Sequence, residues 1–232
     1  MTLALNTELD VAALGLRQVN RALKATESGQ FVVRNPKGAH ALACGLQHPV
    51  EIEIDGPVGY YAAGMNQRAQ ITIHGNAGTG VAENMMSGTV RVRGNASQSA
   101  GATAHGGLLV IEGHASARCG ISMKGVDIVV GGSVGHMAAF MGQAGRMVVL
   151  GDAGEGFGDS LYEARLYVRG TVAALGADCI AKEMREEHHS ELAQLLTRAG
   201  LDADPSAFTR YGSARRLYNF EIDDPNAPEE PR

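Results

Sequence analysis

A glycine returns every 19 residues through the middle of the 232-residue chain, and this spacing limits the folds that the chain can adopt. Two positions before each of these glycines stands isoleucine or valine, and four positions before it stands another large apolar residue. A fixed period of this length predicts a solenoid built from one repeated structural unit. The glycines of this ladder are Gly56, Gly75, Gly94, Gly113, Gly132, Gly151 and Gly170.

Each repeat is expected to open with a short β-strand, because its apolar residues alternate with a period of two. The repeat has no room for a helix between successive strands. The ladder glycine is expected to end the strand with a turn at positive φ. Stacking the strands in register predicts an all-β solenoid, a single-stranded right-handed parallel β-helix with 19-residue coils and helical flanks at both ends. Right-handed coiling is favoured because no apolar column recurs every six residues.

The pattern divides the chain into four segments. An N-terminal capping helix is predicted for residues 1–30. The β-helix is predicted for residues 31–177. Residues 178–220 predict a helical extension with an interface segment. Residues 221–232 are acidic and proline-rich, which predicts a disordered tail.

Both flanking helices can be bounded from local signals. Apolar residues at helical spacing predict a first helix over 7–27, with Thr7 as its N-cap. The same pattern predicts a second helix over 178–199, which Asp178 would cap and Gly200 would end.

A mixed basic and aromatic run follows the second helix. Arginine and tyrosine are enriched at protein–protein interfaces, so this run predicts a contact with another chain. The candidate interface residues are Arg215, Arg216, Tyr218 and Phe220.

Residues that could carry chemistry are dispersed through the repeats. The solenoid histidines, His74, His105, His114 and His136, occupy four different repeat positions, so they are not expected to converge on a metal ion. No carboxylate pair or nucleophile–base pair stands out. His188 and His189 are expected on a solvated helix face. The sequence therefore indicates no catalytic, cofactor-binding or metal-binding residue in this chain.

Composition argues against several classes of partner. The net charge is −5 and there is no basic run, which disfavours nucleic acid and anionic membrane surfaces. No apolar run is long enough to span a bilayer, and the N-terminus lacks the pattern of a signal peptide. Three dispersed cysteines, Cys44, Cys119 and Cys179, predict free, reduced thiols in a cytoplasmic protein.

The glycine ladder, with Gly-Asn-Ala-Gly at 75–78 and Gly-Asn-Ala at 94–96, resembles the GXGXG domain at the C-terminus of the large subunit of glutamate synthase. That resemblance covers about residues 30–177. The segments TELD at 7–10, FVVRNP at 31–36 and YGSARRLYNF at 211–220 resemble stand-alone subunits of this type. One such subunit is the B subunit of N-methylglutamate synthase (methylamine–glutamate N-methyltransferase).

This resemblance implies a complex of three chains. One partner would be a class II glutamine amidotransferase-like subunit, and the other a glutamate synthase-like subunit that holds FMN and an iron–sulfur cluster. The present chain would bridge them without catalytic residues or a cofactor of its own. The implied reaction converts glutamate and methylamine to N-methylglutamate and ammonia.

Other functions stay open. The chain could be a scaffold subunit of another GXGXG complex, such as a glutamate synthase-like enzyme or formylmethanofuran dehydrogenase, in which one subunit has the same β-helix. It could also be a partner or regulator of a glutamine-synthetase-like protein. An autonomous enzyme acting on polysaccharide or peptide in a surface groove would need clustered acids and bases, which the sequence does not display.

Overall fold

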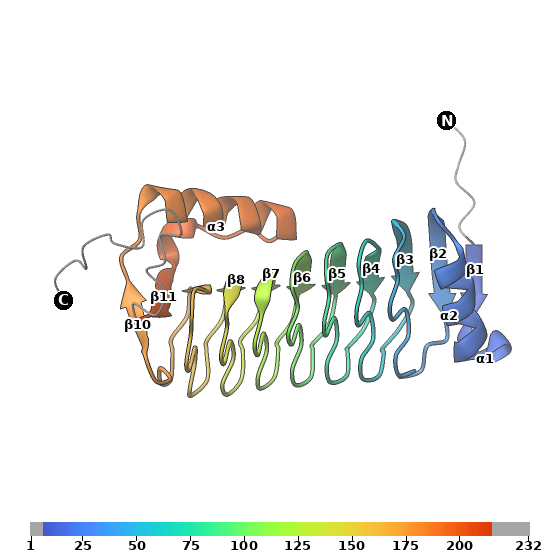
Figure 1. Cartoon of the computed structure of the whole chain (residues 1–232), viewed down its shortest axis with the longest axis horizontal. Helices are drawn as coiled ribbons and strands as arrows, with labels where there is room; N and C mark the ends of the chain where they lie inside the picture. Colours follow the sequence, from blue (N-terminus) through green and yellow to red (C-terminus); the bar gives the residue numbers. More distant parts are fainter. Residues whose placement is uncertain (1–6, 215–232) are drawn as a thin grey trace, which may run out of the picture.

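The computed structural model describes residues 7–214, in which stacked parallel strands form a β-solenoid (Figure 1). The candidate interface residues Arg215, Arg216, Tyr218 and Phe220 lie outside the described residues. The strands, in chain order, are β1 (Thr7–Asp10), β2 (Gly29–Arg34), β3 (Val50–Ile54), β4 (Gln70–Ile73), β5 (Thr89–Val92), β6 (Leu108–Ile111), β7 (Lys124–Val130), β8 (Ala144–Val149), β9 (Arg165–Val168), β10 (Cys179–Lys182) and β11 (Thr209–Ser213).

The coils stack with the register that the glycine spacing predicts. From β3 to β9 each strand pairs in parallel with the next, and Ile52 lies beside Ile71 while Ile54 lies beside Ile73, 19 residues apart. Within the described part of the chain these strands belong to one 11-stranded sheet, in the order β1-β2-β3-β4-β5-β6-β7-β8-β9-β11-β10. The predicted parallel β-solenoid is therefore confirmed.

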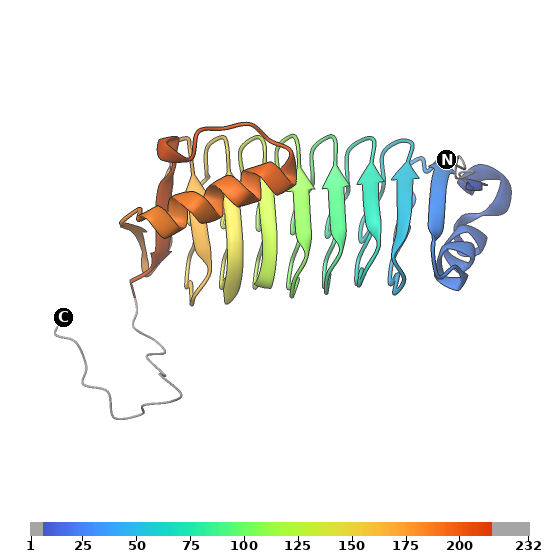
Figure 2. The same cartoon turned by 90° about the horizontal axis from the view of Figure 1, so that it is seen from above.

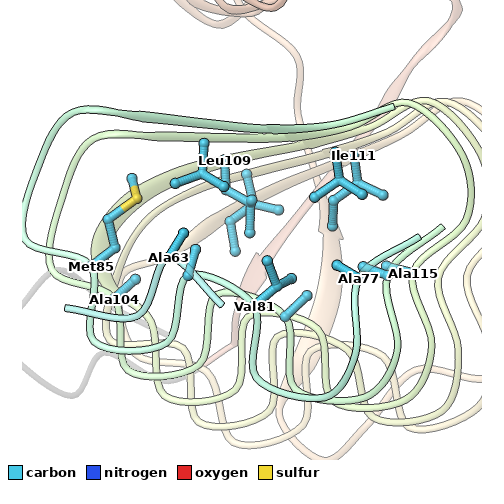
Figure 3. Close-up of a cluster of buried hydrophobic side chains, with 14 of the residues drawn as sticks. Ala63, Ala77, Val81, Met85, Ala104, Leu109, Ile111 and Ala115 are labelled. Carbon is cyan, nitrogen blue, oxygen red and sulfur yellow. The ribbon is translucent and has the colours of Figure 1, made fainter. Parts of the chain in front are cut away.

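The core is a narrow column of packed apolar side chains inside the coils. Leu109 and Ile111 project inward from the sheet, and Ala77, Val81 and Ala115 face them from the opposite wall (Figure 3). The opposite wall stacks through single-residue parallel bridges, such as Ala77 with its neighbours in the two adjacent coils. Small side chains on this wall allow it to approach the bulkier aliphatic residues of the sheet.

The ladder glycines are needed for close packing rather than for positive φ. Only Gly56 among them has positive φ, at 136°, so the predicted turn conformation is wrong for the others. A Cβ atom on Gly75 would lie 2.8 Å from the carbonyl carbon of Gly56 in the preceding coil. The left-handed backbone lies seven residues later, where Ala63 and Ala82 have φ of 54° and 57°.

The N-terminus begins with a strand, which corrects the predicted helix over 7–27. Thr7–Asp10 forms β1, paired in parallel with β2, so Thr7 is not a helix cap. Asp10 is the cap instead, because its carboxylate accepts the backbone N–H of Ala12 at 2.8 Å.

Two short helices follow this strand, α1 (Val11–Leu14) and α2 (Leu16–Ala25). Gly15, with φ of 77°, separates them. α2 buries Val19 and Leu23 against the end of the solenoid core, so the expected capping helix is present in this shorter form.

The C-terminal flank also differs from its prediction. Cys179–Lys182 forms β10, and α3 (Glu186–Ala199) begins only after Arg185, so Asp178 does not cap it. Gly200, with φ of 63°, ends α3 as predicted. A 3-10 turn, η1 (Pro205–Ala207), leads into β11, which lies between β9 and β10 and is antiparallel to both.

Helix α3 lies across the outward face of β6–β9 (Figure 2). The outward residue at the same repeat position changes from Thr72 in β4 and Arg91 in β5 to Val129 in β7 and Val148 in β8. These apolar residues pack under α3 and form a second core. Its helix-side members are Leu192, Leu195, Leu196 and Ala199, joined by Phe208.

Candidate functional site

A group of charged side chains lies between α3 and the outward face of the sheet. The carboxylate of Asp127 on β7 accepts two hydrogen bonds from Arg146 on β8, with Nε–Oδ1 at 2.7 Å and Nη2–Oδ2 at 2.8 Å. Arg198 on α3 donates a third bond at 2.9 Å. Hydrogen bonding to Asp127 raises the pKa of the Arg146 guanidinium above its usual value. This cluster ties two coils to the helix.

A second contact fastens the other half of α3. The hydroxyl of Tyr167 on β9 donates a 2.6 Å hydrogen bond to Glu191, which also lies 3.0 Å from the guanidinium of Arg165. Burial, and then the hydrogen bond to Glu191, raise the pKa of the Tyr167 hydroxyl. Tyr167 therefore remains a neutral donor, which suits a structural contact rather than proton transfer.

Arg91 on β5 holds the C-terminal end of α3. Its Nη2 donates to the carbonyl oxygen of Ala199 at 2.7 Å, and its Nη1 donates to Glu112 at 2.9 Å. A cation at this position satisfies a terminal carbonyl and complements the helix dipole. The charges under α3 therefore serve to attach the helix.

Beyond the end of α3 the outward face of the sheet is hollowed. A depression of about 360 Å³ lies over β4–β6, with Gln70, Thr72 and Thr89 on the sheet and Arg198 from α3 along its edge. The outward faces of β3–β5 continue from it and are not covered by α3 (Figure 2). The outward-facing residues of β3–β5 are exposed or half-buried.

The histidines do not converge, and His114 has a structural role that sequence reasoning missed. His114 occupies the position after a ladder glycine, and its Nδ1 accepts the backbone N–H of Ser133 in the next coil at 3.0 Å. Asn95 and Asp152 accept N–H groups of the following coils in the same way, both at 2.8 Å. A polar residue recurs directly after the ladder glycines, and this pattern could have predicted the hydrogen bonds between coils. Among residues 7–214, no three His, Cys, Asp or Glu side chains are grouped to hold a metal ion.

His188 is buried, which corrects the prediction that it lies on a solvated face. It occupies the first turn of α3, and its Nδ1 accepts the backbone N–H of Arg185 at 3.0 Å. Burial, and then the positive charge of Arg210, lower the pKa of its imidazole. The residue closes the start of the helix, in the manner of a capping box.

All three cysteines are free and buried, in agreement with the predicted unpaired thiols. Burial raises the pKa of Cys119 to about 12 and that of Cys179 to about 11. Burial also raises the pKa of Cys44. Thiols in this state are poor nucleophiles at neutral pH.

The structure brings the ladder glycines into one line along the solenoid, where each permits contact with the preceding coil. No helix in the described range is long and apolar enough to cross a membrane. The resulting arrangement is a rod. Its outer face is covered by α3 over β6–β9 and is not covered by α3 over β3–β5.

Comparison with known proteins identifies a near full-length relative. The chain is 59% identical over 224 residues to "Protein GlxC" of Rhizobium meliloti (strain 1021), which covers 94% of this chain and 98% of that protein. The chain belongs to the GlxC family. No protein-family model matches the GlxC-family chain, and no solved structure matches it. The β-solenoid agrees with the fold that the GXGXG resemblance implies.

Proposed function

We propose that this GlxC-family chain is a non-catalytic structural subunit of a heteromeric N-methylglutamate synthase. The proposal rests mainly on one observation: the charged side chains in the described part of the chain that form the clusters below make contacts within the fold. The clusters around Asp127, Glu191 and Arg91 attach a helix to a solenoid, and the polar residues after the ladder glycines join successive coils. These are the contacts of a scaffold. The GXGXG resemblance and the GlxC relationship favour a complex of the glutamate synthase type.

In this proposal the rod bridges two other subunits. A class II amidotransferase-like subunit and a synthase-like subunit with FMN and an iron–sulfur cluster would carry the chemistry. They would convert glutamate and methylamine to N-methylglutamate and ammonia. The present chain would set the distance between their active sites, and could wall part of a passage that keeps the small amine from escaping.

A β-solenoid suits this role because it is stiff. Each coil is hydrogen-bonded to the next through the sheet and through the opposite wall. Coils stacked at the inter-strand distance advance by about 4.8 Å each, so seven coils span roughly 30 Å. The open outer faces of β3–β5 and the turns on the far side offer separate surfaces for two partners.

The test is co-expression of this chain with its two presumed partners, followed by purification through a tag on this chain. We expect a complex of three chains with flavin absorbance that forms N-methylglutamate from glutamate and methylamine. The matched control omits this chain, and the two remaining subunits should then lose their association or their transfer activity. Purification of this chain alone and colourless would contradict the proposal.

Three measurements separate the alternative functions. Supplying glutamine, 2-oxoglutarate and a two-electron reductant in place of glutamate and methylamine, and measuring glutamate formation, tests a glutamate synthase-like reaction. Binding of a glutamine-synthetase-like protein in the absence of the other two chains would favour the role of partner or regulator. Turnover of a polysaccharide or peptide by the isolated chain would favour an autonomous enzyme.

A further inference from the structure

The exposed face of α2 carries a stripe of positive charge, made of Arg17, Arg21 and Lys24. These residues lie at helical positions i, i+4 and i+7 and therefore share one face. Together with Asn20 and Ala25 they line a depression of about 560 Å³. All three cations are exposed, and no ion pair is found for any of them within residues 7–214.

The stripe is held in place by the rest of α2. Val19 and Leu23 anchor the helix in the core. The side chain of Asn20 donates to the carbonyl oxygen of Ala41 at 2.9 Å and accepts the backbone N–H of Ala43 at 2.8 Å. The three cations are therefore presented from a fixed helix at the N-terminal end of the rod (Figure 1).

The opposite charge belongs to the other end of the chain. Residues 221–232 contain five carboxylates and one arginine, a net charge of −4 out of the −5 of the whole chain. The described chain ends at Ala214, whose N–H donates to the carbonyl oxygen of Asp178 at 2.7 Å. This point lies beside β10 and β11, at the end of the rod opposite α2 (Figure 1).

The distance between the two ends disfavours contact within one molecule. Eight steps of about 4.8 Å separate β2 from β11 in the sheet, which amounts to roughly 38 Å. Asp224 follows Ala214 by ten residues, so even a fully extended chain carries it only about 34 Å. The backbone of the first three carboxylates of the segment, Glu221, Asp223 and Asp224, therefore falls short of β2 in their own molecule, whereas Glu229 and Glu230, at 15 and 16 residues after Ala214, have a reach of about 50 Å. A second molecule is needed for all five carboxylates to have access to a stripe.

We propose that residues 221–232 of one molecule bind the Arg17–Arg21–Lys24 stripe of a second copy. The stripe and Ala214, after which the acidic segment follows, lie at opposite ends of a rod, so an antiparallel pair brings the point from which each acidic segment continues close to the stripe of its partner. Such a pair has two-fold symmetry and is closed, because both stripes and both segments are used. The inference does not depend on the proposed enzymatic role.

The test compares self-association of four proteins by sedimentation velocity at low and high salt. They are the full chain, the triple variant Arg17→Glu/Arg21→Glu/Lys24→Glu, the chain truncated after Phe220, and a control. The control triple variant, Arg68→Glu/Arg118→Glu/Lys124→Glu, makes the same change in charge at exposed positions away from α2. Circular dichroism checks that each protein is folded.

We expect the full chain and the control to form dimers at 50 mM NaCl, with affinity falling about tenfold or more at 500 mM because salt screens exposed charges. The stripe variant and the truncated chain should be monomeric in the same concentration range. A monomeric full chain at low salt, or equal association of the stripe variant and the control, would overturn the inference.

A second measurement examines the contact directly. A fluorescein-labelled peptide of residues 221–232 is titrated with the truncated chain and followed by anisotropy. Saturable binding is expected, with at least tenfold weaker binding when the truncated chain also carries the three stripe substitutions. Absence of binding, or binding that ignores these substitutions, would equally overturn it.

Discussion

Asp127 on β7 and Arg146 on β8 form a two-bond ion pair beneath α3, with bonded atoms 2.7 Å and 2.8 Å apart. Because Arg198 of α3 bonds to the same carboxylate at 2.9 Å, one side chain joins two coils and a helix 71 residues away. The carboxylate is nearly buried, with 8% of the side chain exposed, whereas Arg198 is half exposed.

Asp127→Asn should lower the free energy of unfolding by about 2 kcal/mol, because it removes the charge that pairs with two arginines in a sheltered site. Urea denaturation provides the measurement. Glu155→Gln is the control, since it removes an equal charge from an exposed position. Equal stability losses in the two variants would show that the ion pair does not fasten α3.

Val129→Asp should detach α3 from the sheet. Val129 is fully buried under the helix, and placing a carboxylate there should cost more than about 3 kcal/mol. Thr72→Asp is the matched control at the same repeat position, on a strand that α3 does not cover, and it should change stability by less than about 0.5 kcal/mol. Limited proteolysis reports release of the helix. Resistance of the Val129 variant to cleavage near α3 would contradict the assignment.

Gly75→Ala should destabilise the solenoid by about 1–3 kcal/mol, because the added methyl group would meet backbone atoms of the preceding coil at 2.7 Å. Gly212→Ala is the comparison, since its nearest neighbour would be a side-chain atom of Lys182 at 3.5 Å. Thermal melting of both variants measures the difference. Melting temperatures that fall together would argue that conformational preference, rather than stacking distance, selects the ladder glycines.

The stability of α3 should depend on pH through His188. Its folded pKa lies below the reference value of 6.5, so the unfolded state binds the proton more readily. The stabilising contribution is therefore present above about pH 6.5 and is lost as the pH falls through the folded pKa. His188→Gln retains an acceptor for the N–H of Arg185 but does not titrate. Unfolding free energies measured from pH 8 to pH 5 should fall more steeply in the wild type. Parallel profiles would rule out this linkage.

The thiols should be unreactive until the chain unfolds. Because burial raises the pKa of Cys119 to about 12 and of Cys179 to about 11, almost no thiolate is present at pH 8. A disulfide reagent such as DTNB should label the native protein slowly and all three cysteines at once in guanidinium chloride. If all three cysteines of the native protein reacted rapidly, the core would have to open under native conditions.

Local and periodic information was sufficient for the solenoid. The 19-residue spacing determines the register, because coils can pair throughout only if equivalent residues recur at the same interval. It therefore places Ile52 beside Ile71 and lines up the ladder glycines. Gly200 was also predictable as the end of α3, since an αL residue there closes a helix at low cost.

The sequence also contains a signal for the part of the sheet on which α3 packs. At one repeat position the outward residue changes from polar in β4 and β5 to apolar in Val129 and Val148. A helix long enough to cover those coils follows in the chain. The contacts of Asp127 with Arg198 and of Glu191 with Tyr167, by contrast, depend on the docked geometry, because the two residues of each pair are 71 and 24 positions apart in the sequence.

The sequence by itself determined the repeat, the strands within it and the register in which they pair. Only the tertiary structure decided what happens at the two ends. Thr7–Asp10 pairs with β2, and Cys179–Lys182 pairs with β11, although both stretches fall within patterns that favour helix. The sheet has edges at these places, and pairing satisfies backbone groups that a helix would leave exposed there. Pairing with a neighbouring strand thus outweighed the helix preference of these two stretches. Because Cys179–Lys182 is a strand, α3 begins at Glu186 rather than near Asp178, which places His188 in its buried first turn.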